Sequence, residues 1–203
     1  MSKKLYLFDF DGTLTYKDSF KDFFCTMYGI KKIAWLLLLG IGKISKAIVI
    51  KRDKGKIKEA IIAVLCKGKT KEELQLLGKT YSEQKLHKII RPKALAYLKK
   101  LKNEHAEMYL VSASVDIWLQ NFADEFHLKL ISTQLAYCTN GTFAGHFLGK
   151  NCKGAEKVYR IQQEVDITAY DEIIAFGDSS GDSEMLAIAT QAYYKPFRSA
   201  HAL

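Results

Sequence analysis

The most constraining feature of this sequence is a short apolar strand that ends in carboxylates. Residues 4–10, KLYLFDF, predict a buried β-strand because the run is short, apolar and rich in aromatic residues. Asp9 and Asp11 stand at its end and are followed by Gly12 and two threonines. Acidic side chains are rarely buried without a partner. The pattern therefore indicates a chemical role for the carboxyl end of this strand.

The rest of the chain predicts an α/β fold with a parallel sheet. Strand-like runs at 107–114 and 172–178 alternate with helical patterns at 91–102 and 116–126. Strands that alternate with helices favour a parallel sheet with helices on its faces. The other predicted elements are a hairpin over 130–149 with an Asn-Gly turn, helices over 153–164 and 181–189, and a strand over 192–194.

The segment between the first two strands has helical periodicity and contains no convincing strand. Its aromatic and apolar residues recur at helical spacing, and TKEE at 70–73 is a capping box that starts a helix. We therefore predict a helical cap, residues 15–88, inserted into an α/β core made of residues 1–14 and 89–203.

Composition limits the cellular context. Apolar residues make up 48% of the 203 residues, which is enough for a core. The four cysteines form no Cys-x-x-Cys pair, which argues against a zinc site or a disulfide scaffold and favours a reducing compartment. The N-terminal residues lack the apolar stretch of a signal peptide. We expect a cytoplasmic protein, with peripheral contact at the inner membrane surface as an alternative.

The net charge of +9 is concentrated in one segment. Residues 31–71 carry twelve Lys or Arg against Asp53 and Glu59, a net charge of +10. A solvated helical face explains this, and so does a surface for an anionic partner. A nucleic-acid-binding protein is the less favoured reading, because the segment has little arginine, lacks interleaved aromatic residues and leaves the aspartates unexplained.

An apolar run lies inside the basic segment. Its uninterrupted part, residues 33–42, has ten residues, against the roughly twenty that a helix needs to span a bilayer. We expect residues 33–50 to form the buried core of the cap. The alternative is an interfacial helix that lies on anionic lipid, beside the lysines of the same segment.

Polar residues also follow two later predicted strands. Ser112 and Ser114 end the run YLVSAS, and Asp178 and Asp182 lie in GDSSGDSEML. Taken singly, a serine here, a helix N-cap or a Gly-Asp turn is ordinary. If the three strands are neighbours, however, the carboxylates meet in one crevice beyond their carboxyl ends. Such an oxygen-rich acidic pocket suits Mg²⁺.

These motifs resemble the haloacid dehalogenase superfamily, subfamily IB, which includes phosphoserine phosphatases. DFDGT is similar to its first motif, LVSAS to its second, NCKGAEK to its third and GDSSGDSEM to its fourth. The resemblance covers the whole chain, because the helical segment lies where a C1-type cap would be inserted. It implies a Rossmann-like core and a Mg²⁺-dependent phosphatase that works through an aspartyl-phosphate.

The resemblance also implies catalytic roles. Asp9 is expected to be the nucleophile, and Asp11 the group that protonates the leaving oxygen and then activates water. Ser112 is expected to donate a hydrogen bond to the phosphoryl group. A lysine should offset its charge, and Lys153 and Lys157 are both candidates, with Lys153 preferred because it opens the predicted helix.

The metal and substrate residues follow from the same resemblance. Mg²⁺ is expected on Asp9, the backbone carbonyl of Asp11, Asp178 and Asp182. Substrate binding is expected from Gly12, Asp18, Ser112 and Ala113. Phosphoserine phosphatases carry a glutamate at the place of Asp18, so this shorter side chain has the N-cap of a helix as an alternative role.

The substrate is less well defined than the reaction. The apolar run and DIWL at 116–119 are similar to features of bacterial phosphatidylglycerophosphate phosphatases, although DIWL here follows the second motif. We expect a phosphate monoester that is lipid-linked or otherwise anionic. Phosphoserine or another small metabolite is the alternative, and transfer to an acceptor alcohol in place of water stays open.

Overall fold

The computed structural model describes residues 2–42, 45 and 54–198. Within this part of the chain, a mixed six-stranded sheet has the order β4-β3-β2-β1-β5-β6. Neighbouring strands are parallel except β3 and β4, which form an antiparallel hairpin. The predicted α/β class is confirmed. The strands are β1 Lys4–Phe8, β2 Glu107–Val115, β3 Lys129–Tyr137, β4 Phe143–Leu148, β5 Glu172–Gly177 and β6 Gln191–Tyr194.

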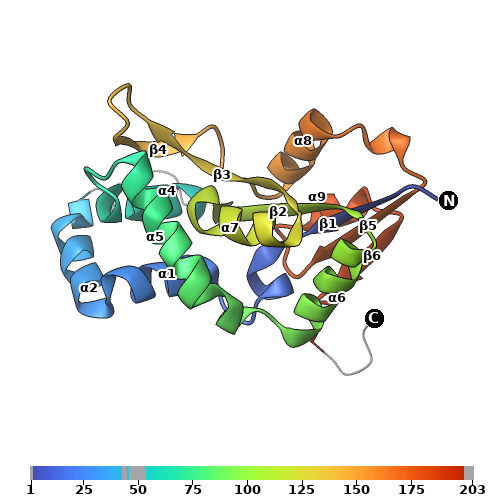
Figure 1. Ribbon diagram of the computed structural model, residues 1–203. Helices are drawn as coiled ribbons and strands as arrows, with labels where there is room; N and C mark the ends of the chain where they lie inside the picture. The colour runs from blue at the N-terminus through green and yellow to red at the C-terminus, as the bar shows by residue number, and fades with distance from the viewer. Residues whose placement is uncertain (1, 43–44, 46–53, 199–203) are drawn as a thin grey trace.

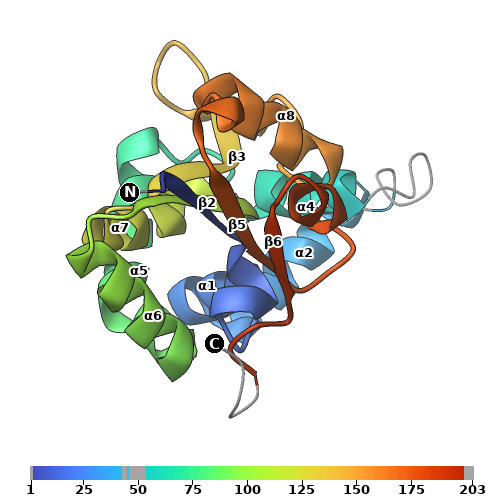
Figure 2. The same ribbon diagram turned by 90° about the vertical axis from the view of Figure 1, so that its right-hand side faces the viewer.

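Helices cover both faces of this sheet (Figure 2). In β1, Tyr6 and Phe8 belong to the core under α6 and α7, whereas Leu5 and Leu7 belong to the core under α8 and α9. This alternation follows from the two-residue period of a strand, and both sets are apolar because both faces are covered. The helices are α6 Pro92–Asn103, α7 Asp116–Phe126, α8 Ala155–Glu164 and α9 Ser183–Ala187.

After a short helical turn, Phe10–Leu14, that follows β1, the described elements before α6 are helical and lie together at one end of the molecule (Figure 1). They are α1 Ser19–Tyr28, α2 Ile30–Leu39, α4 Lys54–Leu65, α5 Lys71–Gln84 and a 3₁₀ turn, Leu86–Ile89. The chain enters and leaves this region side by side, because Tyr16 N donates to Ile89 O at 2.8 Å and Arg91 N to Leu14 O at 2.8 Å. This arrangement supports our proposed division into a cap of 15–88 and a core.

An aromatic cluster seats α1 on α7. Trp118 is fully buried and stacks on Phe23, with ring centroids 4.6 Å apart. Phe20 and Phe24 pack around the same indole, and its Nε1 donates to Ser19 Oγ at 3.0 Å. Because aromatic pairs bury large apolar areas in defined geometries, the cluster fixes the start of α1 beside the end of β2.

The β3–β4 hairpin reaches from the sheet to the helices of the cap segment. Phe143 N donates to Lys69 O at 2.8 Å, and Lys71 N donates to Gly141 O at 3.0 Å. Phe147 N donates to Glu59 Oε1 at 2.8 Å. Gly141 has φ +78°, which the predicted Asn-Gly turn requires. The hairpin and its turn are therefore confirmed, and these hydrogen bonds join the hairpin to α4 and to the start of α5.

Two differences from the sequence predictions bear on the site and on the cap segment. The helix predicted from residue 153 begins at Ala155, because Gly154 has a φ of +63° that a helix cannot continue through. The expectation of a buried apolar run is wrong for α2, where Trp35, Leu38 and Leu39 are 61%, 60% and 67% exposed. The reason is that α2 packs through one side only. Residues 43–44 and 46–50 of that run lie outside the described residues.

Candidate active site

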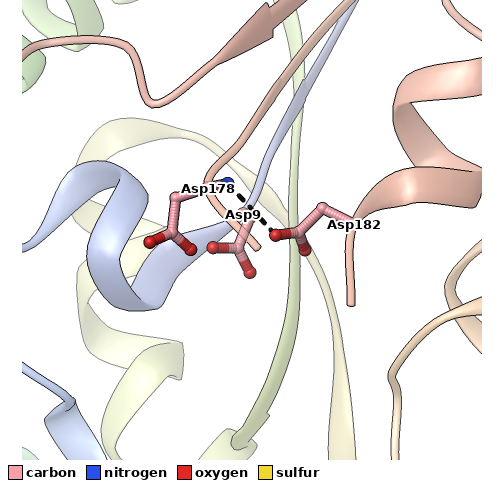
Figure 3. A group of neighbouring side chains, drawn as sticks. All are labelled: Asp9, Asp178 and Asp182. Carbon is pink, nitrogen blue, oxygen red and sulfur yellow. Dashed lines mark hydrogen bonds between the residues drawn. The ribbon is translucent and has the colours of Figure 1, made fainter. Parts of the chain in front are cut away.

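The carboxyl ends of three neighbouring strands form the site. β1 lies between β2 and β5, so the residues that follow these strands are brought to one edge of the sheet. Asp9 N donates to Phe176 O at 2.9 Å, which extends the β1–β5 pairing up to the first carboxylate. Figure 3 shows Asp9 between Asp178 and Asp182, with the three carboxylates at the same level. The sheet order therefore brings Asp9, near the start of the chain, next to Asp178 and Asp182, near its end, as the sequence predicted.

Lys157 holds two of these carboxylates. Its Nζ, on α8, lies 2.7 Å from Asp9 Oδ1 and 2.7 Å from Asp182 Oδ1, and donates to Val111 O at 2.7 Å. Lys157 is 1% exposed. Burial lowers the pKa of this amine, but the two carboxylates outweigh burial and raise it. Lys157 therefore stays charged beside the nucleophile candidate.

Asp9 is buried in spite of its charge. Burial raises the pKa of Asp9 to about 7, while Lys157 opposes the rise. Thr13 Oγ1 donates to Asp9 Oδ2 at 2.9 Å, so both carboxylate oxygens have a protein donor. The side chain is thereby fixed in one orientation at the end of β1. A fixed, poorly solvated carboxylate is a competent nucleophile toward an electrophilic centre bound beside it.

Asp182 organises the loop after β5. Its Oδ2 accepts from Asp178 N at 3.1 Å, from Ser179 N at 3.0 Å and from Ser179 Oγ at 2.9 Å. Burial opposes ionisation, but Lys157 and the two backbone donors hold the pKa of Asp182 below its usual value. Both oxygens of Asp182 are engaged by protein groups, so its geometry suits support of the loop and of Lys157.

Gly12 allows Asp178 to approach the first loop. Gly12 has φ +83°, and a Cβ built there would lie 2.3 Å from Asp178 Oδ2. Arg198, near the C-terminal end, donates from Nη2 to Asp178 Oδ2 at 2.7 Å and to Gly12 O at 3.0 Å. Burial raises the pKa of Asp178, and Arg198 limits that rise. Only glycine satisfies both the backbone conformation and this contact.

Asp11 points toward the start of α1. Its Oδ1 accepts from Ser19 N at 2.6 Å, and its Oδ2 accepts from Ser114 Oγ at 2.5 Å. Ser19 Oγ lies 3.3 Å from Ser114 Oγ and accepts from Trp118 Nε1, so the network runs from the aromatic cluster to the carboxylate. Burial raises the pKa of Asp11, and the Ser114 hydroxyl opposes the rise. A carboxyl group with a raised pKa is suited to exchange protons.

The end of β2 contributes the floor of the pocket. Ser112 is buried and its Oγ accepts from Ser114 N at 3.0 Å. Ala113 O accepts from Lys58 Nζ at 2.9 Å and from Thr133 Oγ1 at 2.9 Å. Lys58 comes from α4, and burial lowers the pKa of its amine. The cap segment therefore brings a lysine to the carboxyl end of β2.

The four aspartates, Lys157, Lys58 and the end of β2 line one pocket of about 220 Å³. Asp18 lies on its wall and is also the N-cap of α1, accepting from Lys21 N at 3.1 Å. The N-cap role that was the alternative for Asp18 is therefore present in the structure. Lys153 also lies on the wall but does not contact Asp9, because it precedes α8 and projects from the loop. Of the two candidate lysines, the structure places Lys157 against the carboxylates.

The carboxylates fit a hard divalent cation. One oxygen each from Asp9, Asp178 and Asp182 can be chosen so that all three lie within 4.8 Å of one another. The pKa values of Asp9 and Asp178 are raised by burial, so their negative charge is not fully offset by Lys157 and Arg198. Oxygen ligands and uncompensated negative charge are what Mg²⁺ selects. Asp182 accepts four hydrogen bonds from the protein, whereas Asp9 accepts two and Asp178 one, so Asp9 and Asp178 have more free lone pairs with which to hold the cation.

Several residues of the site were not predicted from the sequence. Thr13, the last residue of the first motif, donates to Asp9, and Ser19, which begins α1 six residues later, donates to Asp11. Lys58 is one of many lysines in a basic segment, and Arg198 lies 20 residues beyond Asp178. Position in or near the first motif could have pointed to Thr13 and Ser19, whereas Lys58 and Arg198 lie far from any motif.

The fold is a Rossmann-like α/β architecture, and the site gathers carboxylates beyond the carboxyl ends of its strands. Residues 6–187 match the family model described as haloacid dehalogenase-like hydrolase. The chain is 36% identical over 199 residues to Protein CicA of Caulobacter vibrioides (strain NA1000 / CB15N), which covers 96% of this chain and 86% of that protein. The chain therefore belongs to the haloacid dehalogenase-like hydrolases.

Solved structures with low sequence identity share this fold. A protein of unknown function from Bordetella pertussis Tohama I has a TM-score of 0.78 at 18% identity, covering 95% of this chain and 89% of its own. A substrate-bound phosphoserine phosphatase has a TM-score of 0.64 at 19% identity, covering 96% and 86%. A phospho-aspartyl intermediate analogue of phosphoserine phosphatase has a TM-score of 0.61 at 22% identity, covering 93% and 84%.

Proposed function

We propose that this hydrolase is a Mg²⁺-dependent phosphatase that cleaves phosphate monoesters through an aspartyl-phosphate. The observation that carries the proposal is the position of Asp9, held at 2.7 Å by Lys157 and facing a pocket that Asp11 shares. Two carboxyl groups on one loop allow one to attack while the other handles protons. The structural similarity to a phosphoserine phosphatase and its phospho-aspartyl analogue supports the same chemistry.

The reaction has two steps at Asp9. In the first, an Asp9 carboxylate oxygen forms a bond to phosphorus as the ester bond to the leaving oxygen breaks, and Asp11 gives that oxygen a proton. In the second, Asp11 takes a proton from water, the water oxygen bonds to phosphorus, and the phosphorus–Asp9 bond breaks. Ser112 and the backbone near Ala113 bind the phosphoryl oxygens, and the charge of Lys157, whose three donors are taken by Asp9, Asp182 and Val111 O, offsets the negative charge of the phosphoryl group and the nucleophile.

Bound Mg²⁺ would shield the charge between the phosphoryl group and the carboxylates. Asp9, Asp178 and the backbone carbonyl of Asp11 would hold it, and Asp182 would keep the loop in place. Arg198 fixes one oxygen of Asp178 and thereby orients the carboxylate. Positioning of this kind around a metal ligand commonly matters for affinity as much as the ligand itself.

Mg²⁺ should stabilise the folded protein and be required for turnover. We expect millimolar Mg²⁺ to raise the unfolding temperature and to support phosphate release from p-nitrophenyl phosphate, since a ligand that binds only the folded state stabilises it. Asp178→Asn should remove both effects, whereas Asp124→Asn, on the exposed side of α7, should retain them. Thermal unfolding and a phosphate-release assay, each with and without EDTA, measure this. An equal Mg²⁺ response in Asp178→Asn would contradict the assignment.

The substrate class that we propose is an anionic phosphate monoester, including lipid-linked esters. The exposed face of α2 supports a lipid source, because Trp35, Leu38 and Leu39 are spaced to share one face. No helix within the described residues has the length and apolar character needed to cross a membrane. The geometry therefore favours peripheral contact with an anionic membrane surface, as interfacial helices with nearby lysines make.

This contact is expected to show in vesicle sedimentation. At low salt, the protein should sediment with vesicles that contain phosphatidylglycerol and not with pure phosphatidylcholine vesicles. Leu39→Glu should lower partitioning onto the vesicles at least about tenfold. The leucine surface that would be buried in the membrane is lost, and a charge repelled by the anionic lipid is added. Leu76→Glu is the matched control, since Leu76 is 66% exposed on α5. Equal binding by the two variants, or no binding by the wild type, would remove the membrane contact from the proposal.

A further inference from the structure

Lys153 is left without a partner by the arrangement of the catalytic carboxylates. The third motif contains two lysines, and Lys157 alone contacts Asp9 and Asp182. Within the described part of the chain, the Lys153 ammonium takes part in no ion pair and no side-chain hydrogen bond. It nevertheless lies on the wall of the catalytic pocket. A cation that faces a reaction pocket and is not neutralised by the protein is available to a substrate.

Packing against Gly181 sets the position of the Lys153 side chain. Its side chain packs over Gly181, where a Cβ would lie 2.6 Å from Lys153 Cε and 3.0 Å from Lys153 Cγ. The backbone next to it is tied to the same loop, since Gly154 N donates to Gly181 O at 2.9 Å. Gly181 thus leaves the space in which the stem of Lys153 lies. The ammonium is held at the pocket wall by packing, with its three donors unused.

Lys153 also borders a second, wider cavity. This groove has a volume of about 970 Å³ and lies between the loop after β4 and the start of α4. Lys56, Lys150, Phe147 and Tyr159 are among its lining residues, and Lys153 is the residue that it shares with the catalytic pocket. The 220 Å³ catalytic pocket suits a phosphoryl group, and the groove has room for the remainder of a larger ester.

The groove has an excess of positive charge. Its acidic residue, Glu156, pairs with Arg160 Nε at 2.9 Å, and Lys56 pairs with Glu59 at 2.7 Å. Lys150 and Lys153 have no such pair among the described residues. The charges that remain for a ligand are therefore two ammonium groups, of which Lys153 is nearer to the reaction. Carboxylate and phosphate oxygens are their natural partners.

We propose that Lys153 is a specificity residue that binds a second anionic group on the alcohol portion of the phosphate monoester, with the groove holding the rest of that alcohol. This inference rests on the proposed phosphatase function and defines its substrate class more closely. A carboxylate, a phosphodiester and a second phosphate share the required chemistry. The second anion belongs a few bonds beyond the ester oxygen, because Lys153 stands where the pocket opens into the groove.

Two matched pairs of esters test the proposal and separate small metabolites from lipids. 3-Phosphoglycerate carries a carboxylate where glycerol 3-phosphate carries a hydroxymethyl group. Short-chain phosphatidylglycerophosphate carries a phosphodiester that short-chain phosphatidic acid lacks. The quantity measured is the ratio of kcat/KM within each pair. We expect the wild type to prefer the ester with the second anion in at least one pair, and that pair identifies the source of the anion.

Substitution of Lys153 should remove this preference. Lys153→Met should lower the ratio about tenfold or more, chiefly through KM, since a hydrogen bond between charged groups is lost. Lys153→Arg should keep most of the preference. Gly181→Ala should lower the ratio without removing the lysine, because the new methyl group displaces its stem. Lys99→Met, an exposed lysine on α6, is the control for loss of one charge.

These experiments distinguish failure of the Lys153 proposal from failure of the phosphatase function. An equal fall in kcat/KM on both members of each pair would place Lys153 on the transferred phosphoryl group and overturn the proposal. An unchanged ratio in Lys153→Met, or no preference in the wild type, would overturn it as well. Absence of phosphate release from all four esters by the wild type would instead contradict the phosphatase function on which the inference rests.

Discussion

Asp9→Asn is expected to lower phosphatase turnover by about 10⁴-fold or more, because an amide oxygen cannot displace the leaving group and no other side chain occupies its position. The substitution is nearly isosteric. It keeps the acceptor for Lys157 at the oxygen and leaves Thr13 within reach, so the pocket should retain its shape. Phosphate release from p-nitrophenyl phosphate, followed over hours at high enzyme concentration, measures the loss.

The fold should survive this change. Burial raises the pKa of Asp9 to about 7, so the native state already opposes a charge there, and a neutral amide removes that penalty. We expect the free energy of unfolding to stay within about 1–2 kcal/mol of the wild type. Acid-quenched wild-type protein should carry covalent phosphate, and the Asp9→Asn variant should carry none. Retained turnover, or covalent phosphate on the Asp9→Asn variant, would end the assignment of Asp9 as the nucleophile.

The sheet and its catalytic edge could be predicted because their signals are local. Each strand is a short apolar run, and each is followed at once by polar residues, as at Asp9 and Asp178. The period of two in a strand and the alternation with helices then determine a parallel sheet. The predicted meeting of the carboxylates required the three strands to be neighbours. The observed order, with β1 between β2 and β5, meets this requirement.

The choice between the two lysines was beyond the sequence. Lys153 and Lys157 are four residues apart, and on a single helix they would share a face. In the structure they do not share a helix. Gly154 has a positive φ, α8 begins after it, and only Lys157 lies on the helix. A glycine adopts such a conformation at little cost but does not require it, so the sequence alone did not fix where the helix begins.

Long-range partners were missed for a related reason. Arg198 reaches Asp178 and Gly12 O across distant parts of the chain, and Lys58 reaches Ala113 O from a helix of the cap segment. Neither lies in a periodic pattern or beside a motif. The exposed face of α2 was misread as core because hydrophobicity predicts burial only when another element covers the surface, and here packing leaves Trp35 and Leu39 uncovered.

Lys157→Met should be the most destabilising single change in the site. The lysine side chain is 1% exposed and joins two carboxylates that are themselves buried, at 2.7 Å each. Removing one partner of a buried ion pair leaves an uncompensated charge, which costs about 3–5 kcal/mol. Urea unfolding in EDTA measures this. Lys153→Met removes an exposed lysine of the same motif without an ion pair and should cost less than about 0.5 kcal/mol.

The pH dependence of this loss identifies its cause. Without Lys157, the folded-state pKa of Asp9 should rise further, and that of Asp182 should rise from its lowered value, because their compensating cation is gone while burial remains. The folded variant then binds more protons than the unfolded chain in the range between the unfolded and folded pKa values, so its stability increases as pH falls. We expect the deficit of Lys157→Met to be largest near pH 8 and to shrink toward pH 5. A deficit that does not change with pH would mean that lost packing of the lysine stem, rather than buried charge, is what destabilises the variant.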